Sequence, residues 1–160
     1  MYKNIVVGID GSDHGAKALA HAVRMAREFK SNLHVFHAVK NTFAFPSYPL
    51  GIDPLHQQPV VSAVTQMTMN DYRRKEGERV IKQAMQQVKD MQLDIEGKVE
   101  YHLETSKGPA DYAETYAKEH GADVIVLGCA GHHSRARKAF VGTVADHVMN
   151  NAPCNVLLVR

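Results

Sequence analysis

Residues 124–148 form the stretch VIVLGCAGHHSRARKAFVGTVADHV, in which a strand, a loop and a helix are predicted to follow one another. The run Val124–Leu127 is continuously apolar, which is typical of a strand buried on both faces. Gly128 ends this run, and Gly142 precedes a segment with helical spacing of its apolar residues. A strand that leads through a loop into a helix is the repeating unit of a parallel α/β sheet.

The same alternation continues over the rest of the chain. Strands are predicted at Asn4–Ile9, Asn32–Val39, Glu96–Leu103, Asp123–Leu127 and Asn155–Val159. Helices are predicted at Ser12–Phe29, at Met67–Met91, from Gly108-Pro109 onward and at Gly142–Asn151. Strict alternation favours one α/β domain over residues 1–160, with a parallel sheet covered by helices on both faces. In such sheets, ligands bind beyond the carboxyl ends of the strands, where the strand order reverses.

Composition limits the classes of function. The chain has 160 residues, of which 44% are hydrophobic and 22% charged, and its net charge is +2. A dedicated nucleic-acid surface normally needs a strong basic excess, so we expect no nucleic-acid partner. No segment approaches the roughly 18 apolar residues of a membrane span, so we expect no membrane insertion. Cys129 and Cys154 form no CxxC pair, and with no secretory signal we expect reduced thiols in a cytoplasmic protein.

The segment Asn41–Thr65 departs from the alternating pattern. It holds four of the six prolines together with three aromatic residues, which predicts a long irregular loop. Such a loop is either a mobile connection or a lid or partner surface, because long loops in compact domains are often functional. The sequence favours the plain connection slightly.

The loop between Gly128 and Thr143 carries the clearest chemical signal. Glycines allow a ligand to approach the backbone closely, and the free N–H groups at a helix start favour an anion. The intervening residues are basic and contain no acid, and they include His132, Arg137 and Lys138. A phosphate cradle is one interpretation, and a surface loop with turn glycines and solvated charges is the other. The motifs GxxxxGK[ST] and GxGxxG are both absent, which excludes two familiar phosphate-binding loops.

Taken together, several short motifs resemble the universal stress protein family. They are Gly8-Ile9-Asp10-Gly11-Ser12, Gly128-x-x-Gly131, Gly142-Thr143 and the closing Pro153-Cys154-Asn155-Val156-Leu157-Leu158-Val159. The resemblance covers nearly the whole chain except Asn41–Thr65. It implies a three-layer Rossmann-like fold whose five parallel strands lie in the order 3-2-1-4-5. It also implies a homodimer through the last strand, Val156–Val159, and, for one branch of the family, ATP binding through a G-x2-G-x9-G-[ST] motif.

The resemblance also implies a set of nucleotide-binding positions. They are Ile9, Asp10, Ala38, Leu127, Gly128, Gly131, Gly142, Thr143 and Val144. We add His132 and Arg137, whose positions between the glycines suit contact with, or attraction of, the phosphates. Asp10 would lie near the ribose or a magnesium ion carried by the ATP, although a turn or helix-capping role is an open alternative. Ala38 and Leu127 would also serve as ordinary core residues.

One difference from the family motif bears on function. Ten residues, His132–Val141, separate Gly131 from Gly142, one more than the motif has. We expect an ATP-binding regulator that acts as a homodimer with an unidentified regulatory partner. The alternative is an interaction module of the same fold without nucleotide. The sequence shows no arrangement of catalytic residues, so we expect at most slow ATP hydrolysis. We expect no protein metal site either, because adjacent histidines such as His132-His133 chelate a metal ion poorly.

Overall fold

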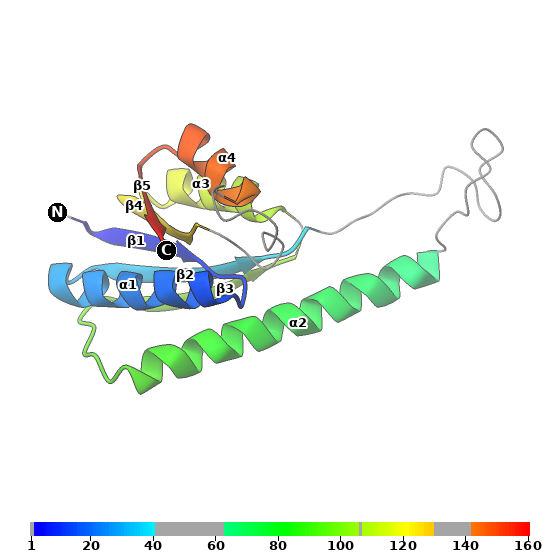
Figure 1. The fold of residues 1–160 in the computed structure, drawn as a ribbon, viewed down its shortest axis with the longest axis horizontal. Helices are drawn as coiled ribbons and strands as arrows, with labels where there is room; N and C mark the ends of the chain where they lie inside the picture. Colours follow the sequence, from blue (N-terminus) through cyan, green and yellow to red (C-terminus); the bar gives the residue numbers. More distant parts are fainter. Residues whose placement is uncertain (1, 41–62, 106, 130–141) are drawn as a thin grey trace.

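The computed structural model describes residues 2–40, 63–105, 107–129 and 142–160. Five strands alternate with four helices along the chain (Figure 1). The strands are β1 (Asn4–Gly8), β2 (Asn32–Ala38), β3 (Val99–Glu104), β4 (Val124–Gly128) and β5 (Asn155–Val159). The helices are α1 (Asp13–Phe29), α2 (Ala63–Asp90), α3 (Pro109–Glu119) and α4 (Thr143–Asn151).

The strands form one parallel sheet in the order β3-β2-β1-β4-β5, which confirms the predicted fold class. β1 is central and pairs with β2 on one side and with β4 on the other. The strand order therefore runs outward from β1 in two directions, first to β2 and β3 and then to β4 and β5. The carboxyl ends of β1 and β4 lie side by side where the direction reverses, which is where ligands of open α/β sheets bind.

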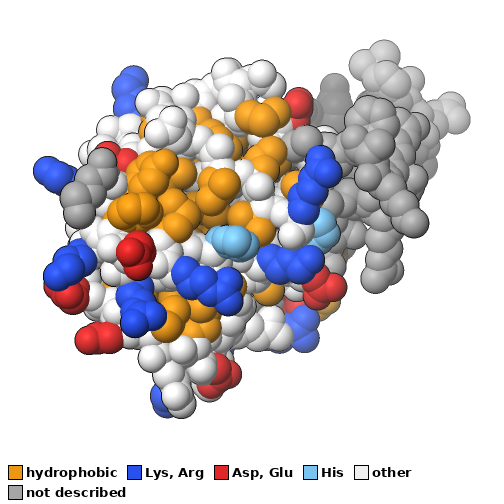
Figure 2. All heavy atoms as spheres, turned by 60° about the vertical axis from the view of Figure 1, so that its left-hand side comes forward, with side chains coloured by type: hydrophobic (Ala, Val, Ile, Leu, Met, Phe, Trp, Pro, Cys, Tyr) orange, Lys and Arg blue, Asp and Glu red, His pale blue; other side chains and the backbone are white. Residues whose placement is uncertain are grey.

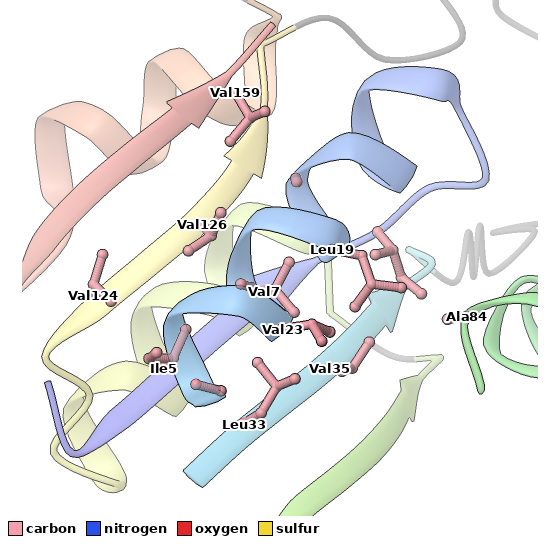
Figure 3. Packing of buried hydrophobic residues seen from close by; sticks show 14 of the residues in the cluster. Ile5, Val7, Leu19, Val23, Leu33, Val35, Ala84, Val124, Val126 and Val159 are labelled. Atoms are coloured by element: carbon pink, nitrogen blue, oxygen red, sulfur yellow. The ribbon is translucent and has the colours of Figure 1, made fainter. Parts of the chain in front are cut away.

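One face of the sheet is covered by α1 and α2 (Figure 1). Buried aliphatic side chains of β1, β2 and β4 pack there against α1, and Val159 of β5 joins them (Figure 3). The buried face of α1 carries Leu19, Ala22, Val23 and Ala26, which recur at helical spacing. α2 contributes Ile81 and Ala84 to the same core.

The other face is covered by α3 and α4. Side chains of alternating strand residues, such as Val6 and Phe36, pack there against Ala113 and Ala117 of α3 and against Val148 of α4. Side chains of a strand alternate between the two faces of the sheet, so β1 contributes side chains to both cores. Its sequence is therefore a continuous apolar run.

Two element boundaries differ from the sequence prediction by more than one residue. α2 begins at Ala63 rather than Met67, so the end of the predicted loop Asn41–Thr65 is helical. No proline or glycine interrupts the sequence between residues 60 and 76, which allows the helix to begin earlier. β3 begins at Val99 rather than Glu96. Gly97 lies against the backbone of Ser31, where a Cβ would be 2.0 Å from the carbonyl oxygen, and the ladder with β2 starts only at Val99.

The remaining residues 41–62, which include the four prolines, lie outside the described residues. None of the helices in the described ranges is long and apolar enough to cross a membrane. On the face drawn in Figure 2, apolar side chains gather together, and both basic and acidic side chains surround them.

Candidate functional site

The predicted site lies at the carboxyl ends of β1, β2 and β4. Ile9, Ala38 and Leu127 are each buried, with 8%, 8% and 5% of their surface exposed. The backbone of Ile9 is fixed on both sides, because its N–H donates to Phe36 O (2.9 Å) and its carbonyl oxygen lies 2.7 Å from Nδ1 of His37. Ile9 belongs to the core on the α1 and α2 side of the sheet, whereas Ala38 and Leu127 belong to the core on the α3 and α4 side, so all three serve as core residues.

Asp10 shapes the turn between β1 and α1. Its Oδ1 accepts a hydrogen bond from the backbone N–H of Ser12 (3.0 Å) and another from the Ser12 hydroxyl (2.5 Å). Ser12 in turn caps α1 by accepting from Gly15 N–H (3.1 Å), so Ser12 rather than Asp13 is the cap. The turn role that the sequence left open for Asp10 is therefore present, and it occupies one carboxylate oxygen.

Gly128 brings the end of β4 against the first turn of α1. A Cβ at this position would lie 2.7 Å from the backbone carbon of His14 and 2.9 Å from Gly15 N. Real Cβ atoms essentially never come so close to another heavy atom. The glycine thus allows the carboxyl end of β4 and the start of α1 to meet at the centre of the site.

His14 belongs to this site although the sequence motifs did not single it out. Its Nδ1 lies 3.2 Å from Sγ of Cys129, directly after Gly128. His14 follows Asp10 in the first turn of the helix after β1. The signal that could have identified it is its position there, because residues of that turn face the carboxyl ends of the strands in this fold.

Gly142, Thr143 and Val144 form the start of α4. Gly142 N–H donates to Cys129 O (2.8 Å), and Cys129 N–H donates to Val159 O (2.9 Å), which ties the start of α4 to the ends of β4 and β5. Gly142 is the N-cap of α4, and because glycine has no side chain it makes no side-chain capping hydrogen bond. Thr143 is exposed and Val144 is partly buried against the α3 and α4 side of the core.

The two helix starts at this edge therefore differ. The first turn of α1 is closed by the Ser12 hydroxyl, whereas that of α4 has no side-chain cap. Uncapped N–H groups and the positive end of the helix dipole favour an anion. Eight of the eleven predicted positions lie in the described residues, five of them at or just after the ends of β1, β2 and β4 and three at the start of α4. Three others, Gly131, His132 and Arg137, lie outside the described residues.

Both cysteines, Cys129 and Cys154, lie in the described residues and are free thiols. Burial raises the pKa of the Cys154 thiol, so this residue is a neutral, packed side chain near neutral pH. Its side chain packs against the apolar core on the α3 and α4 side. Cys154 therefore takes no part in the site at the carboxyl ends of the strands.

Comparison with known sequences finds relatives that align along the full chain. Universal stress protein MJ0531 of Methanocaldococcus jannaschii is 28% identical over 161 residues, which cover 100% of this chain and 83% of the relative. Universal stress protein YxiE of Bacillus subtilis is 28% identical over 160 residues, which cover 100% of this chain and 100% of the relative.

Solved structures agree with this relationship. Universal stress protein UspA from Lactobacillus plantarum superposes with a TM-score of 0.74 at 28% identity, covering 99% of this chain and 98% of that one. A universal stress protein in complex with cAMP shares the fold at 21% identity, with a TM-score of 0.67 over 99% of this chain and 97% of its own.

The Archaeoglobus fulgidus universal stress protein in complex with dAMP also shares the fold. It superposes with a TM-score of 0.61 at 22% identity, over 99% of this chain and 98% of that one. In addition, the model of the universal stress protein family matches residues 1–160, the whole sequence. Fold, motifs and full-length similarity agree, and the chain belongs to the universal stress protein family.

Proposed function

We propose that this chain is a regulator that binds an adenine nucleotide. The proposed nucleotide is ATP, and the proposed site is the edge of the sheet formed by Asp10, Gly128 and the start of α4. The observation that carries the proposal is the uncapped first turn of α4 beside the close contact between Gly128 and α1. This turn offers N–H donors to phosphate oxygens at the point where the strand order reverses.

Two further features support a nucleotide. The apolar residues Ile9, Ala38 and Leu127 at the strand ends suit the neighbourhood of an adenine or ribose, because small-molecule sites are mostly apolar with a few convergent polar groups. Two solved proteins of the same fold are complexes with cAMP and with dAMP, and both ligands are adenine nucleotides. The basic residues between Gly131 and Gly142, which include His132 and Arg137, would add attraction for a polyphosphate.

Magnesium would come with the nucleotide rather than with the protein. Asp10 uses Oδ1 in its turn, so only its second carboxylate oxygen would be available to a cation on the phosphates. Mg²⁺ commonly keeps several waters and binds through one or two carboxylates plus substrate phosphates. A single available carboxylate oxygen suits binding rather than rapid hydrolysis. We therefore propose a sensor, with at most slow phosphate release.

We further propose that the chain acts as a homodimer through Val156–Val159 of β5. β5 is the last strand in the sheet order, so its outer side has no neighbouring strand among the described residues. Leu157, which is 36% exposed, adds an apolar side chain to this edge. An open apolar edge strand is a natural surface for pairing, and a symmetric copy would cover both edges at once. Nucleotide occupancy would then be read by a regulatory partner protein.

The second candidate function is a dimeric interaction module without nucleotide. It is favoured by the tenth residue between Gly131 and Gly142 and by Gly142 N–H, which already donates to Cys129 O. That N–H is consequently not a free donor for a phosphate. The two candidates make opposite predictions about ligand content.

The test is mass spectrometry of nucleotides released by acid from the purified full-length protein. Retained ATP, ADP or AMP in amounts near one per chain supports the nucleotide regulator. Protein without nucleotide, which also fails to take up added ATP, supports the interaction module. A further possibility is slow ATP hydrolysis, which is tested by measuring phosphate release from ATP with the wild type and with Asp10→Ala. Hydrolysis at this site requires that the wild type releases phosphate and that the variant does not.

A further inference from the structure

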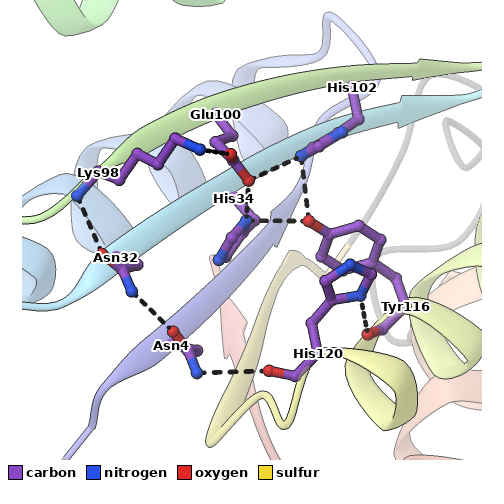
Figure 4. A network of polar contacts seen from close by, with 8 residues as sticks. All are labelled: Asn4, Asn32, His34, Lys98, Glu100, His102, Tyr116 and His120. Atoms are coloured by element: carbon purple, nitrogen blue, oxygen red, sulfur yellow. Dashed lines mark hydrogen bonds and ion pairs between the residues drawn. The ribbon is translucent and has the colours of Figure 1, made fainter.

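A second polar cluster lies away from the nucleotide edge, on the face of the sheet that α3 and α4 cover. Three side chains with metal-binding atoms converge there: His34 from β2, and Glu100 and His102 from β3. Their ligand atoms all lie within 4.8 Å of one another. Figure 4 shows the three side chains, together with Tyr116 of α3, pointing toward a common centre.

The strand register explains why these residues meet. His34 is directly opposite Glu100, and Phe36 is directly opposite His102, in the parallel ladder of β2 and β3. Because side chains alternate between faces, His34, Glu100 and His102 all project toward α3. This arrangement is built into the sheet and does not depend on a loop.

The distances match the dimensions of a tetrahedral metal site. His34 Nδ1 lies 3.0 Å from Glu100 Oε2 and 3.0 Å from the Tyr116 hydroxyl. His102 Nε2 lies 3.2 Å from the same hydroxyl and 3.8 Å from Glu100 Oε2. Ligand atoms bound tetrahedrally at 2.0–2.1 Å are about 3.3 Å apart, so an ion fits after small side-chain movements.

We propose that His34, Glu100 and His102 bind one divalent transition-metal ion of the zinc type. Two imidazoles and one carboxylate are a ligand set found in zinc sites with three protein ligands, which leave a fourth position for water. Imidazole nitrogen favours Zn²⁺ and similar ions over Mg²⁺ or Ca²⁺, which prefer oxygen. The Tyr116 hydroxyl lies 3.0 Å from His34 Nδ1 and 3.2 Å from His102 Nε2, beside this open position, where it would hydrogen-bond to that water.

The contacts of Glu100 suit this role. Lys98 contacts Oε1 of Glu100, which leaves Oε2 facing the histidines. Binding of an ion at Nδ1 of His34 requires the neutral ring with its proton on Nε2.

The surroundings hold the cluster in place while leaving it accessible. His34 is only 8% exposed, whereas the side chains of Glu100 and His102 are 27% and 29% exposed. Tyr116 is held by the ring of His120, which stacks on it with centroids 3.9 Å apart and planes 10° apart. An ion would thus reach the site from solvent and would connect β2 with the edge strand β3.

The probe is Zn²⁺, titrated calorimetrically into full-length protein stripped of metal and nucleotide, with Co²⁺ absorption as the second readout. We expect one ion per chain and the visible bands of tetrahedral Co²⁺ without thiolate charge transfer. Loss of an outer-shell partner of a metal typically costs about 10- to 100-fold in affinity, so Glu100→Gln and His102→Ala should each lose at least that much.

Matched controls separate this site from other histidines and thiols. His21→Ala changes an exposed histidine of α1, and a His132→Gln/His133→Gln/Cys129→Ser triple variant removes other potential ligands. Both should keep full Zn²⁺ affinity. Circular dichroism verifies that each variant is folded, and Glu100→Gln, which preserves size, keeps the test decisive if His102→Ala unfolds. Failure of the wild type to bind one ion, or unchanged affinity in folded Glu100→Gln, would overturn the proposal.

Discussion

Gly142 N–H donates a 2.8 Å hydrogen bond to Cys129 O, so the two ends of the glycine-rich loop are joined directly. Cys129 is itself fixed by donating to Val159 O (2.9 Å). The start of α4 is therefore positioned by β4 and β5. The ten residues His132–Val141 fall between the two joined ends, in the part of the chain outside the described residues.

The first prediction separates the two roles of Asp10. Asp10→Ala removes the acceptor for both Ser12 donors, and hydrogen bonds to charged groups are worth about 1.5–3 kcal/mol, so we expect a loss of unfolding free energy of this order. Asp10→Asn keeps an acceptor oxygen but removes the charge, so it should retain most of the stability. Urea denaturation of the three proteins measures this difference.

The same pair of variants tests the cation contact. If the second oxygen of Asp10 approaches magnesium, Asp10→Asn should weaken binding of ATP with magnesium more than binding of ATP alone. Equal weakening under both conditions would show that Asp10 acts only through the turn.

The second prediction concerns Gly128. Gly128→Ala places a Cβ against the backbone of His14 and Gly15, which cannot move without shifting α1. Overpacking of this kind typically costs about 1–3 kcal/mol, and we expect a loss of stability in that range.

Gly77→Ala is the matched control for Gly128→Ala. Its Cβ would meet the flexible end of Leu103, and alanine gains about 1 kcal/mol over glycine inside a helix. Thermal unfolding should therefore show a clearly smaller loss for Gly77→Ala. If the two variants lose the same stability, the packing role assigned to Gly128 is wrong.

The third prediction concerns the dimer. Leu157→Glu introduces a charge at the edge strand β5 and should convert the dimer to a monomer, because a buried unpaired carboxylate is costly in an interface. Met85→Glu changes a similarly exposed apolar residue on α2, which is 44% exposed, and should leave the dimer intact. Sedimentation velocity distinguishes the species. A wild-type monomer at micromolar concentration would contradict the proposed dimer.

The fourth prediction concerns acid stability. Asp123 Oδ2 accepts from the backbone N–H groups of Asn4 (2.9 Å) and Lys3 (2.6 Å), and these bonds lower the pKa of Asp123 below its ordinary value of 3.8. A lowered pKa in the folded state stabilises the protein at pH values above the ordinary pKa. This stabilisation is lost as the pH falls through the lowered value.

Asp123→Asn should therefore be less stable than wild type at neutral pH, and the difference should shrink as the pH falls below 3.8. Urea denaturation at a series of pH values measures it. A difference that stays constant over the whole acid range would show that the carboxylate charge contributes nothing.

Much of the fold was predictable because local patterns and global topology agree. The apolar run at Val124–Leu127 and the spacing of Leu19, Val23 and Ala26 are direct consequences of burial in a sheet and on a helix face. The strand order came from the family resemblance rather than from these patterns. The late start of β3 was not predictable, because it depends on the close approach of Gly97 to Ser31, a contact between distant residues.

The candidate sites also combine features that the sequence predicts with features that depend on contacts between distant residues. Asp10 and Gly128 were recognisable because ligands of such sheets gather after the strands. Their turn and packing roles required the structure, since the contacts involve Ser12, His14 and Gly15. The cluster of His34, Glu100 and His102 carries no spacing signal at all. It arises only when the register of β2 against β3 places residues far apart in sequence on one face.

Calorimetric titration of ATP into nucleotide-free protein, with and without magnesium, is the most direct test of nucleotide binding at the start of α4. We expect saturable binding in the micromolar range with one ATP per chain. Thr143→Val, which replaces an exposed hydroxyl at this helix start, should weaken binding without lowering the melting temperature. Absence of saturable binding in the wild-type protein would rule out the proposed nucleotide site and would favour the dimeric interaction module instead.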